Sequence, residues 1–441
     1  MTIGTGQDPT PAVEAALLLA EQAYTAANPL SRMRHERACT VLPGGHSRDI
    51  LSYTPFPLTM AAGDHAHITD LDGHDYLDMV GDYAAGIYGH TCAPIERAVA
   101  ETLDGGVCLS SPNTQELELA ELISRRIPSM EQLRFCNSGS EACLFAVQAA
   151  LHATNRAKLL VFDGCCHGAF MDYRSGTAMN VSFDVIKATY NDIAGTRAVL
   201  RAERNHLAAV IVEPMLTHGV IPAKREFLAM LREETRRLGI VLVFDEVMTS
   251  LLAPGGVQGL RGIDPDLTTL GKSWGGGFAF GAFGGSRTLM RHFDTAKGGR
   301  LWQGGTFSGN VIAMSAGLVG ARDVYTPEAC IKLNSLGDSL RLQLNALGRS
   351  VGLSFHATGL GSVLSTHWNE SGMTEPSRVE PGTASVRRLF QLEMIARGYF
   401  VSPRGMIALS LPMTARDVKA FVAEVRAYLT RHADILPRSS K

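Results

Sequence analysis

The sequence predicts an α/β fold in which a mostly parallel central sheet is flanked by helices. Residues 239–244 form a continuous apolar run, as expected for a parallel strand that is buried on both faces. The 45 glycines indicate many tight turns and close backbone approaches. Strand-like and helical segments also alternate along the chain, with strands expected at 133–137, 159–162 and 205–214 and helices at 141–152 and 226–238.

The rest of the chain predicts further helices and a hairpin. Residues 12–37 predict an amphipathic helix that is broken at Asn28-Pro29, and residues 67–78 predict a hairpin that turns at Asp72-Gly73. Further helices are expected at 93–103, 114–127, 311–325, 330–347, 384–397 and 415–432. We therefore expect an N-terminal segment (1–75), a large domain (76–318) and a small α+β C-terminal domain (319–441).

Composition excludes several classes of protein. The formal charge of -2 gives no reason to expect nucleic acid or an anionic membrane as partner, and no apolar run reaches membrane-spanning length. The eight cysteines are scattered without spaced CxxC pairs, so neither a disulfide framework nor a zinc module is indicated. We expect a cytoplasmic enzyme whose thiols stay reduced.

The most informative stretch is residues 266–277, in which Lys272 follows a strand-like run and is surrounded by glycine. Glycines let a backbone pass close to a ligand, and a desolvated lysine amine is a candidate for Schiff-base formation. A solvated surface lysine is one alternative. A nucleotide-binding P-loop is another, but that pattern requires a glycine where this chain has Asp266.

Other segments offer an anion site and a buried acid. Ser138-Gly139-Ser140 stands between a strand and a helix start, where free N–H groups attract anions, although an ordinary helix cap is the better explanation of an isolated motif. Asp245 ends the apolar strand at 239–244, on the edge where parallel sheets carry their ligands. Cys165-Cys166-His167 invites a metal interpretation, but no second ligand pair has a usual spacing, so no metal is expected.

Taken together, these features satisfy the needs of pyridoxal 5'-phosphate (PLP). Its phosphate requires a helix N-terminus, its ring nitrogen a carboxylate, and its aldehyde a lysine amine. The sequence offers Ser138 to Ser140, Asp245 and Lys272 for these three groups.

The same motifs resemble those of class III aminotransferases of fold type I over nearly the whole chain. They are residues 137–142, 212–214, 244–249, 266–277 and 305–310. Within that family the chain resembles the glutamate-1-semialdehyde 2,1-aminomutase branch. Residues 43–48, 53–58, 82–90 and 403–406 are more similar to the β-phenylalanine (β-amino acid) aminotransferases of that branch.

The resemblance implies a role for each site residue. Lys272 forms the Schiff base and moves the proton, and Asp245 pairs with the ring nitrogen. The cofactor is further bound or surrounded by Ser138, Gly139, Ser140, Cys166, His167, Glu213, Met248 and, from the neighbouring subunit of a homodimer, Thr306. Substrate carboxylates are assigned to Arg48 and Arg404, and Tyr83 to the substrate pocket. Without the resemblance, the segment around Arg48 favours a surface charge, and the sequence does not decide whether Tyr83 packs in the interior or lines a pocket.

The chain departs from the family pattern at two positions. The family usually has an aromatic residue at Cys166, stacked on the cofactor ring, and cysteine gives a smaller and softer face. Threonine is common where Ser140 stands, and serine keeps its hydroxyl. Neither change removes a catalytic group.

We therefore expect an aminotransferase that moves an amino group from a β-amino acid to 2-oxoglutarate or pyruvate. The aminomutase, which moves an amine within one substrate, shares every cofactor residue and is the alternative. A PLP-binding protein without transamination activity and a P-loop protein are weaker alternatives.

Overall fold

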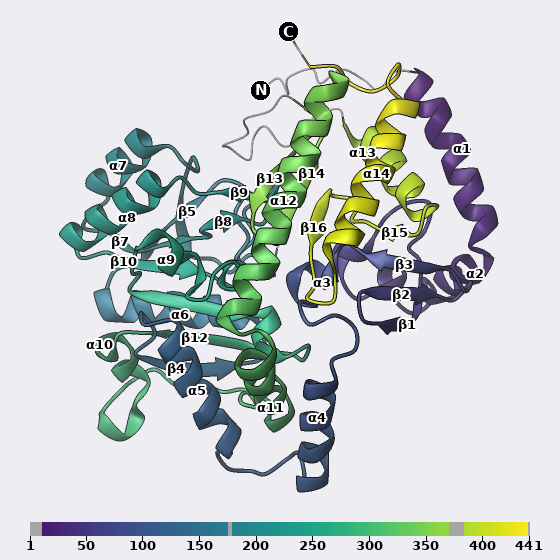
Figure 1. Ribbon diagram of the computed structural model, residues 1–441. Helices are drawn as coiled ribbons and strands as arrows, with labels where there is room; N and C mark the ends of the chain where they lie inside the picture. Colours follow the sequence, from purple (N-terminus) through teal and green to yellow (C-terminus); the bar gives the residue numbers. More distant parts are fainter. Residues whose placement is uncertain (1–10, 175–178, 370–382, 440–441) are drawn as a thin grey trace.

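The computed structural model describes residues 11–174, 179–369 and 383–439 (Figure 1). Its centre is a seven-stranded sheet in the order β4-β12-β11-β10-β7-β5-β6. Within these ranges, no helix combines the length and apolar character needed to cross a membrane.

Six strands of this sheet run in one direction, and β12 is antiparallel to both of its neighbours. The central strands contain almost only apolar side chains because helices cover both faces of the sheet. The strands are β4 (Gln132–Cys136), β12 (Gly281–Gly285), β11 (Leu267–Gly271), β10 (Val241–Asp245), β7 (Leu207–Val212), β5 (Lys158–Phe162) and β6 (Asp184–Ala188).

Helices cover this sheet on both faces. α6 (Gly139–Thr154) packs against β12, β11, β10 and β7, while α8 (Arg225–Leu238) packs against β10 and against α7 (Ile193–Ala202) (Figure 1). The helix expected at 311–325 is α-helical only over α11 (Val311–Val319) and continues as a π-helical turn over Gly320–Val324. The remaining elements are α4 (Ala93–Gly105), α5 (Thr114–Arg126), α9 (Gly256–Arg261), α10 (Arg287–Met290) and the short hairpin β8 (Met215–Leu216) and β9 (Ile221–Pro222).

The C-terminal part forms a second layer of helices and strands. The antiparallel strands β13 (His356–Leu360), β14 (Val363–His367) and β16 (Met406–Ala408) pack with α12 (Pro327–Val351), α13 (Ala384–Ile395) and α14 (Ala415–Arg431). Within this layer, α12 lies on the side that faces the large sheet (Figure 1). The fold class predicted from the sequence is therefore confirmed.

The N-terminal segment joins this second layer. The predicted hairpin is present as β2 (His67–Asp70) and β3 (Asp75–Asp78), preceded by β1 (Met60–Asp64). The C-terminal strand β15 (Tyr399–Phe400) pairs with β3, and α1 (Pro11–Ala27) packs against α13. The domain boundaries at residues 75 and 318 stay predictions.

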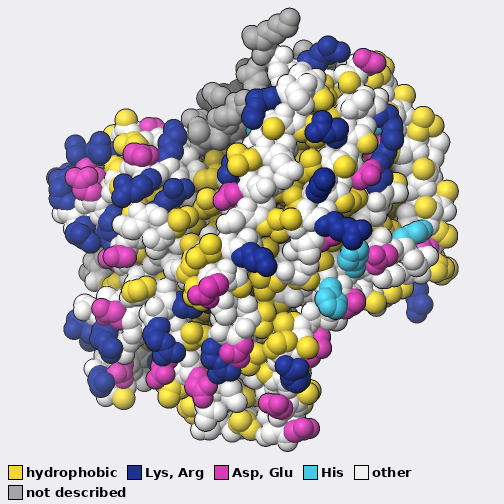
Figure 2. Space-filling view, viewed as in Figure 1, with side chains coloured by type: hydrophobic (Ala, Val, Ile, Leu, Met, Phe, Trp, Pro, Cys, Tyr) yellow, Lys and Arg dark blue, Asp and Glu magenta, His cyan; other side chains and the backbone are white. Residues whose placement is uncertain are grey.

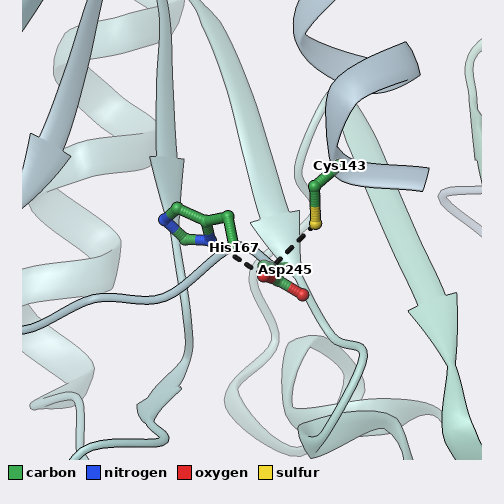
Figure 3. Close-up of side chains that lie close together, drawn as sticks. All are labelled: Cys143, His167 and Asp245. Carbon is green, nitrogen blue, oxygen red and sulfur yellow. Dashed lines mark hydrogen bonds and ion pairs between the residues drawn. The ribbon is translucent and has the colours of Figure 1, made fainter. Parts of the chain in front are cut away.

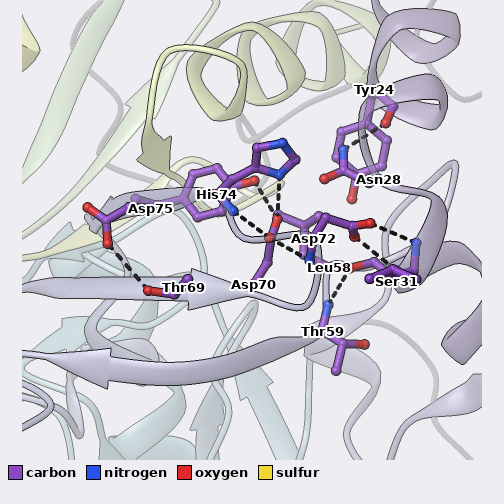
Figure 4. Close-up of polar contacts among 12 residues, drawn as sticks. Tyr24, Asn28, Ser31, Leu58, Thr59, Thr69, Asp70, Asp72, His74 and Asp75 are labelled. Carbon is purple, nitrogen blue, oxygen red and sulfur yellow. Dashed lines mark hydrogen bonds and ion pairs between the residues drawn. The ribbon is translucent and has the colours of Figure 1, made fainter.

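The turn between β2 and β3 also anchors α2 (Pro29–Ala38) (Figure 4). Asp72 accepts hydrogen bonds from the backbone N–H groups of Leu30 at 2.7 Å and Ser31 at 3.0 Å, so it caps the helix from outside. Asp70 in turn accepts from the backbone N–H of Asp72 at 2.9 Å. Because α2 leads directly into residues 43–48, this network positions the segment that carries a predicted substrate arginine.

Candidate active site

Most predicted site residues lie at one edge of the large sheet. Asp245 ends β10, Lys272 follows β11 directly, and Glu213 follows β7. Ser138 follows β4, which runs parallel to β11, and the loop with His167 follows β5. Carboxyl ends of parallel strands meet at the same edge, so the topology brings these distant segments together.

Asp245 is a buried carboxylate that is held by several donors (Figure 3). It accepts from His167 Nδ1 at 2.8 Å and from the backbone N–H of Val247 at 3.1 Å. Burial raises the pKa of Asp245, but His167, Val247 and Cys143 together lower it below its ordinary value through hydrogen bonds and the charge of His167. Sequence reasoning missed two further contacts, from Cys143 and Thr269, because they depend on how α6 and β11 pack against β10.

Lys272 stands at the start of a short 3-10 turn (Lys272–Gly275) with φ +53°, a conformation that is uncommon outside glycine. Its Nζ donates a hydrogen bond to the backbone carbonyl of Tyr83 at 2.7 Å. Desolvation lowers the pKa of the Lys272 amine, although Asp245 and Glu213 oppose the effect. A lowered pKa leaves more of the amine neutral, as a nucleophile and base requires.

The N-terminus of α6 holds the three residues that were predicted to bind the phosphate. Ser138 is its N-cap, and its Oγ accepts from the backbone N–H of Glu141 at 3.2 Å. The alternative interpretation as a helix cap is therefore correct for this hydroxyl. Ser140 Oγ accepts from Ala169 N–H at 3.2 Å, and a methyl group on Gly139 would collide with Val247 at 2.7 Å. The first turn of α6 thus keeps a glycine where space is smallest.

Glu213 links the loop after β5 to the segment after β7. Its carboxylate accepts from the backbone N–H of Cys166 at 2.9 Å and from Thr217 Oγ1 at 2.5 Å, and burial raises its pKa. Met248 is buried beside Thr217, with its Sδ 3.9 Å from Thr217 Oγ1. Glu213 therefore fixes the backbone at Cys166, the position where the family usually carries an aromatic ring.

Cys143, His167 and Asp245 also have the chemistry of metal ligands. Their ligand atoms lie within 4.8 Å of one another, and all three residues are buried. The contacts between them are hydrogen bonds to one carboxylate (Figure 3). Our expectation that the protein uses no metal stays a prediction.

The predicted substrate residues gather around the short turn Gly81–Ala84. Asp82, Tyr83 and Ala84 all have positive φ, and Arg48 Nη2 contacts Asp82 Oδ1 at 2.9 Å. Arg404 is exposed in the turn before β16. Burial raises the pKa of Tyr83, and a hydrogen bond with Ser402 and the charge of Arg404 reduce this rise. A cavity of about 780 Å³ is lined by Arg48, Asp82 and Tyr83.

Thr306 lies apart from this group. It is exposed in a turn that lines a separate cavity together with residues 107–113. Gln303 Nε2 anchors this turn on the carbonyl of Phe135 at 2.6 Å. A single chain therefore presents Thr306 outward, as required of a residue that serves a neighbouring subunit.

Comparison with known proteins decides the family. Residues 51–378 match the family described as aminotransferase class-III. The chain belongs to the class III aminotransferases. The β-phenylalanine transaminase of Variovorax paradoxus is 42% identical over 431 residues, which cover 97% of this chain and 99% of that protein. The crystal structure of a β-phenylalanine aminotransferase from that organism superimposes with a TM-score of 0.96 at 41% identity. The superposition includes 97% of this aminotransferase and 100% of the chain in that crystal structure.

Two further relatives bear on the chemistry. A glutamate-1-semialdehyde 2,1-aminomutase of Chloroherpeton thalassium is 40% identical over 304 residues, 64% of this chain and 70% of its own. A transaminase solved with PLP bound is 28% identical, with a TM-score of 0.85 over 92% of this aminotransferase and 98% of that chain. The predicted resemblance and cofactor are confirmed.

The residues of the aminotransferase fit PLP. When bound, PLP supplies an aldehyde for the amine and a protonated ring that withdraws electrons from the amine-bearing carbon. A buried carboxylate with a lowered pKa suits the ring nitrogen, and a desolvated lysine suits the aldehyde. Gly139 and Ser140 present N–H groups at the positive end of the α6 dipole, where a phosphate is favoured.

Proposed function

We propose that the aminotransferase takes the amino group of a β-amino acid, such as β-phenylalanine, and gives it to a keto acid, 2-oxoglutarate or pyruvate. The observation that carries this proposal is the 42% identity to a β-phenylalanine transaminase over 97% of the chain. Two predicted carboxylate ligands, Arg48 and Arg404, near the tyrosine whose carbonyl contacts Lys272, give it chemical support.

In this proposal separate side chains bind the substrate carboxylate, transfer the proton and hold the cofactor. Arg48 and Arg404 hold carboxylates, for which the planar guanidinium offers paired donors. The Lys272 amine takes the proton from the amine-bearing carbon, and its hydrogen bond to the Tyr83 carbonyl orients the nitrogen. Asp245 keeps the ring nitrogen protonated, while Cys166, Glu213 and Met248 surround the cofactor.

We also propose a homodimer with shared active sites, in which Thr306 of one subunit contacts the phosphate held by the other. Apolar side chains beside Thr306 are exposed to an unusual degree, at 81% for Trp302, 63% for Phe307 and 50% for Leu109. Large exposed apolar groups that lie close together are typical of interaction surfaces. A second copy would bury them.

The cytoplasm is the proposed location, since all eight cysteines are free thiols. Small amino and keto acids are the proposed partners. On the face shown in Figure 2, basic and acidic side chains are interspersed, in keeping with the formal charge of -2.

The test is a half-reaction on PLP-loaded protein. Racemic β-phenylalanine is added without a keto acid, and the visible absorbance band of the cofactor is followed. Loss of the band, reversed by 2-oxoglutarate or pyruvate, is the expected result, and the Lys272→Ala variant serves as the inactive control. A band that persists with β-phenylalanine but responds to glutamate-1-semialdehyde would overturn the proposal in favour of the aminomutase.

A further inference from the structure

Cys143 lies in the first turns of α6, directly against Asp245 (Figure 3). Its Sγ is 3.3 Å from Asp245 Oδ2 and 3.4 Å from Thr269 Oγ1. The side chain is almost fully buried, with 1% of the residue exposed. The thiol is therefore closed off from solvent and faces the carboxylate that serves the ring nitrogen.

The two oxygens of Asp245 share four donors. Oδ2 receives His167 Nδ1 at 2.8 Å and Cys143 Sγ at 3.3 Å. Oδ1 receives Thr269 Oγ1 at 3.2 Å and the backbone N–H of Val247 at 3.1 Å. A buried carboxylate depends on such donors to remain ionised, because burial alone favours the neutral acid.

The thiol has its proton available for this contact. Burial and the charge of Asp245 raise the pKa of Cys143 well above its ordinary value, so the group stays S–H. Thr269 uses its own proton on Oδ1, which leaves the Cys143 proton free for Oδ2. A thiol is a weaker donor than a hydroxyl, so it orients the carboxylate while withdrawing less of its charge.

We propose that Cys143 is a positioning residue for Asp245, and that its thiol holds the carboxylate in the orientation that pairs with the ring nitrogen of PLP. Cys143 touches neither cofactor nor substrate in this role. This role concerns binding of the cofactor and not the identity of the amino donor. A result that refutes it would therefore leave the proposed β-amino acid reaction untouched, and the reverse also holds.

The test compares the affinity of the protein for PLP and for the analogue in which a C–H replaces the ring nitrogen. The analogue keeps the phosphate and aldehyde but cannot pair with Asp245. Cys143→Val fills the space of the thiol without a donor, and we expect about threefold to tenfold weaker binding of PLP with unchanged binding of the analogue. Cys143→Ser restores a donor and is expected to bind PLP within about twofold of the native protein.

Two further variants complete the experiment. Cys143→Ala removes the same donor without added bulk and predicts the same selective loss, which keeps the test open if Cys143→Val does not fold. Cys330→Ala removes an equally buried thiol that contacts the carbonyl of Leu251 instead, and it should change neither affinity. Equal losses for PLP and the analogue, or unchanged PLP affinity in Cys143→Val or, where that variant does not fold, in Cys143→Ala, would overturn the inference.

Discussion

Gly168 provides the sharpest test of the phosphate cradle. Its φ is +93°, and a Cβ at this position would lie 2.2 Å from Ser140 Oγ and 2.6 Å from Ser140 Cα. Ordinary contacts between such atoms need about 3.5 Å. Because the Cα belongs to the first turn of α6, the Gly168→Ala variant has to shift the helix start, or the loop itself, by roughly 1 Å.

The cost has two parts that a control variant separates. A left-handed conformation costs a non-glycine residue about 1–2 kcal/mol, wherever it occurs. Gly352 has φ +67° with open space around its Cβ position, so Gly352→Ala carries the strain alone. Gly168→Ala adds the displacement of Ser140, and loss of one or two charge-assisted hydrogen bonds to the phosphate weakens PLP binding at least about tenfold.

The assay is titration of cofactor-free protein with PLP, followed by absorbance, alongside thermal unfolding of the same samples. We expect both variants to unfold at lower temperature and only Gly168→Ala to lose PLP affinity. If Gly168→Ala bound PLP as tightly as Gly352→Ala does, Ser140 would not be part of the phosphate site.

Three further predictions follow from the site and its surroundings. Lys272→Ala should abolish turnover and leave the circular dichroism spectrum unchanged; retained activity would refute the role of the amine. Arg48→Leu should raise KM for β-phenylalanine at least about tenfold, because a charge-assisted contact is lost, and leave an amine without a carboxylate unaffected; equal effects on both would remove Arg48 from the carboxylate site. Hydrogen bonds and charge from Arg201 and Arg237 lower the pKa of Glu234 to about 2, and its side chain is only 4% exposed. The stability that this lowered pKa contributes is present above the ordinary pKa of 4.5 and is lost as the pH falls towards 2. Glu234→Gln should therefore lower the free energy of unfolding by about 1–2 kcal/mol at pH 7, after allowance for solvent screening, and leave it unchanged near pH 2. Thermal unfolding at both pH values tests this.

The strands that could be predicted from the sequence are those composed almost entirely of apolar residues. β5, β7 and β10 contain uninterrupted apolar residues, which only a strand buried on both faces explains well. β12 (Gly281–Gly285) was not predicted because glycine and alanine give no strand signal. The structure supplies the reason for its glycines, since a Cβ at Gly281 would lie 2.2 Å from the carbonyl of Ser138 and one at Gly284 would lie 2.5 Å from that of Gln132.

The proposed cofactor residues could be located from the sequence because their motifs are local, and their roles stay predictions. Asp245 ends a recognisable strand, and Lys272 and His167 each follow one. Cys143 and Thr269 were missed, because Thr269 reaches Asp245 only through the register of β10 with β11, and Cys143 only through the packing of α6. Such contacts depend on geometry between elements, which a single sequence does not specify.

The proposed function requires that these segments meet in one PLP site in which Lys272 binds the cofactor covalently. Reduction of the PLP-loaded protein with borohydride, followed by mass analysis of its peptides, tests this claim directly. We expect the reduced cofactor on the peptide that contains Lys272 and on no other lysine. Attachment at a different lysine, or none in protein saturated with PLP, would contradict it.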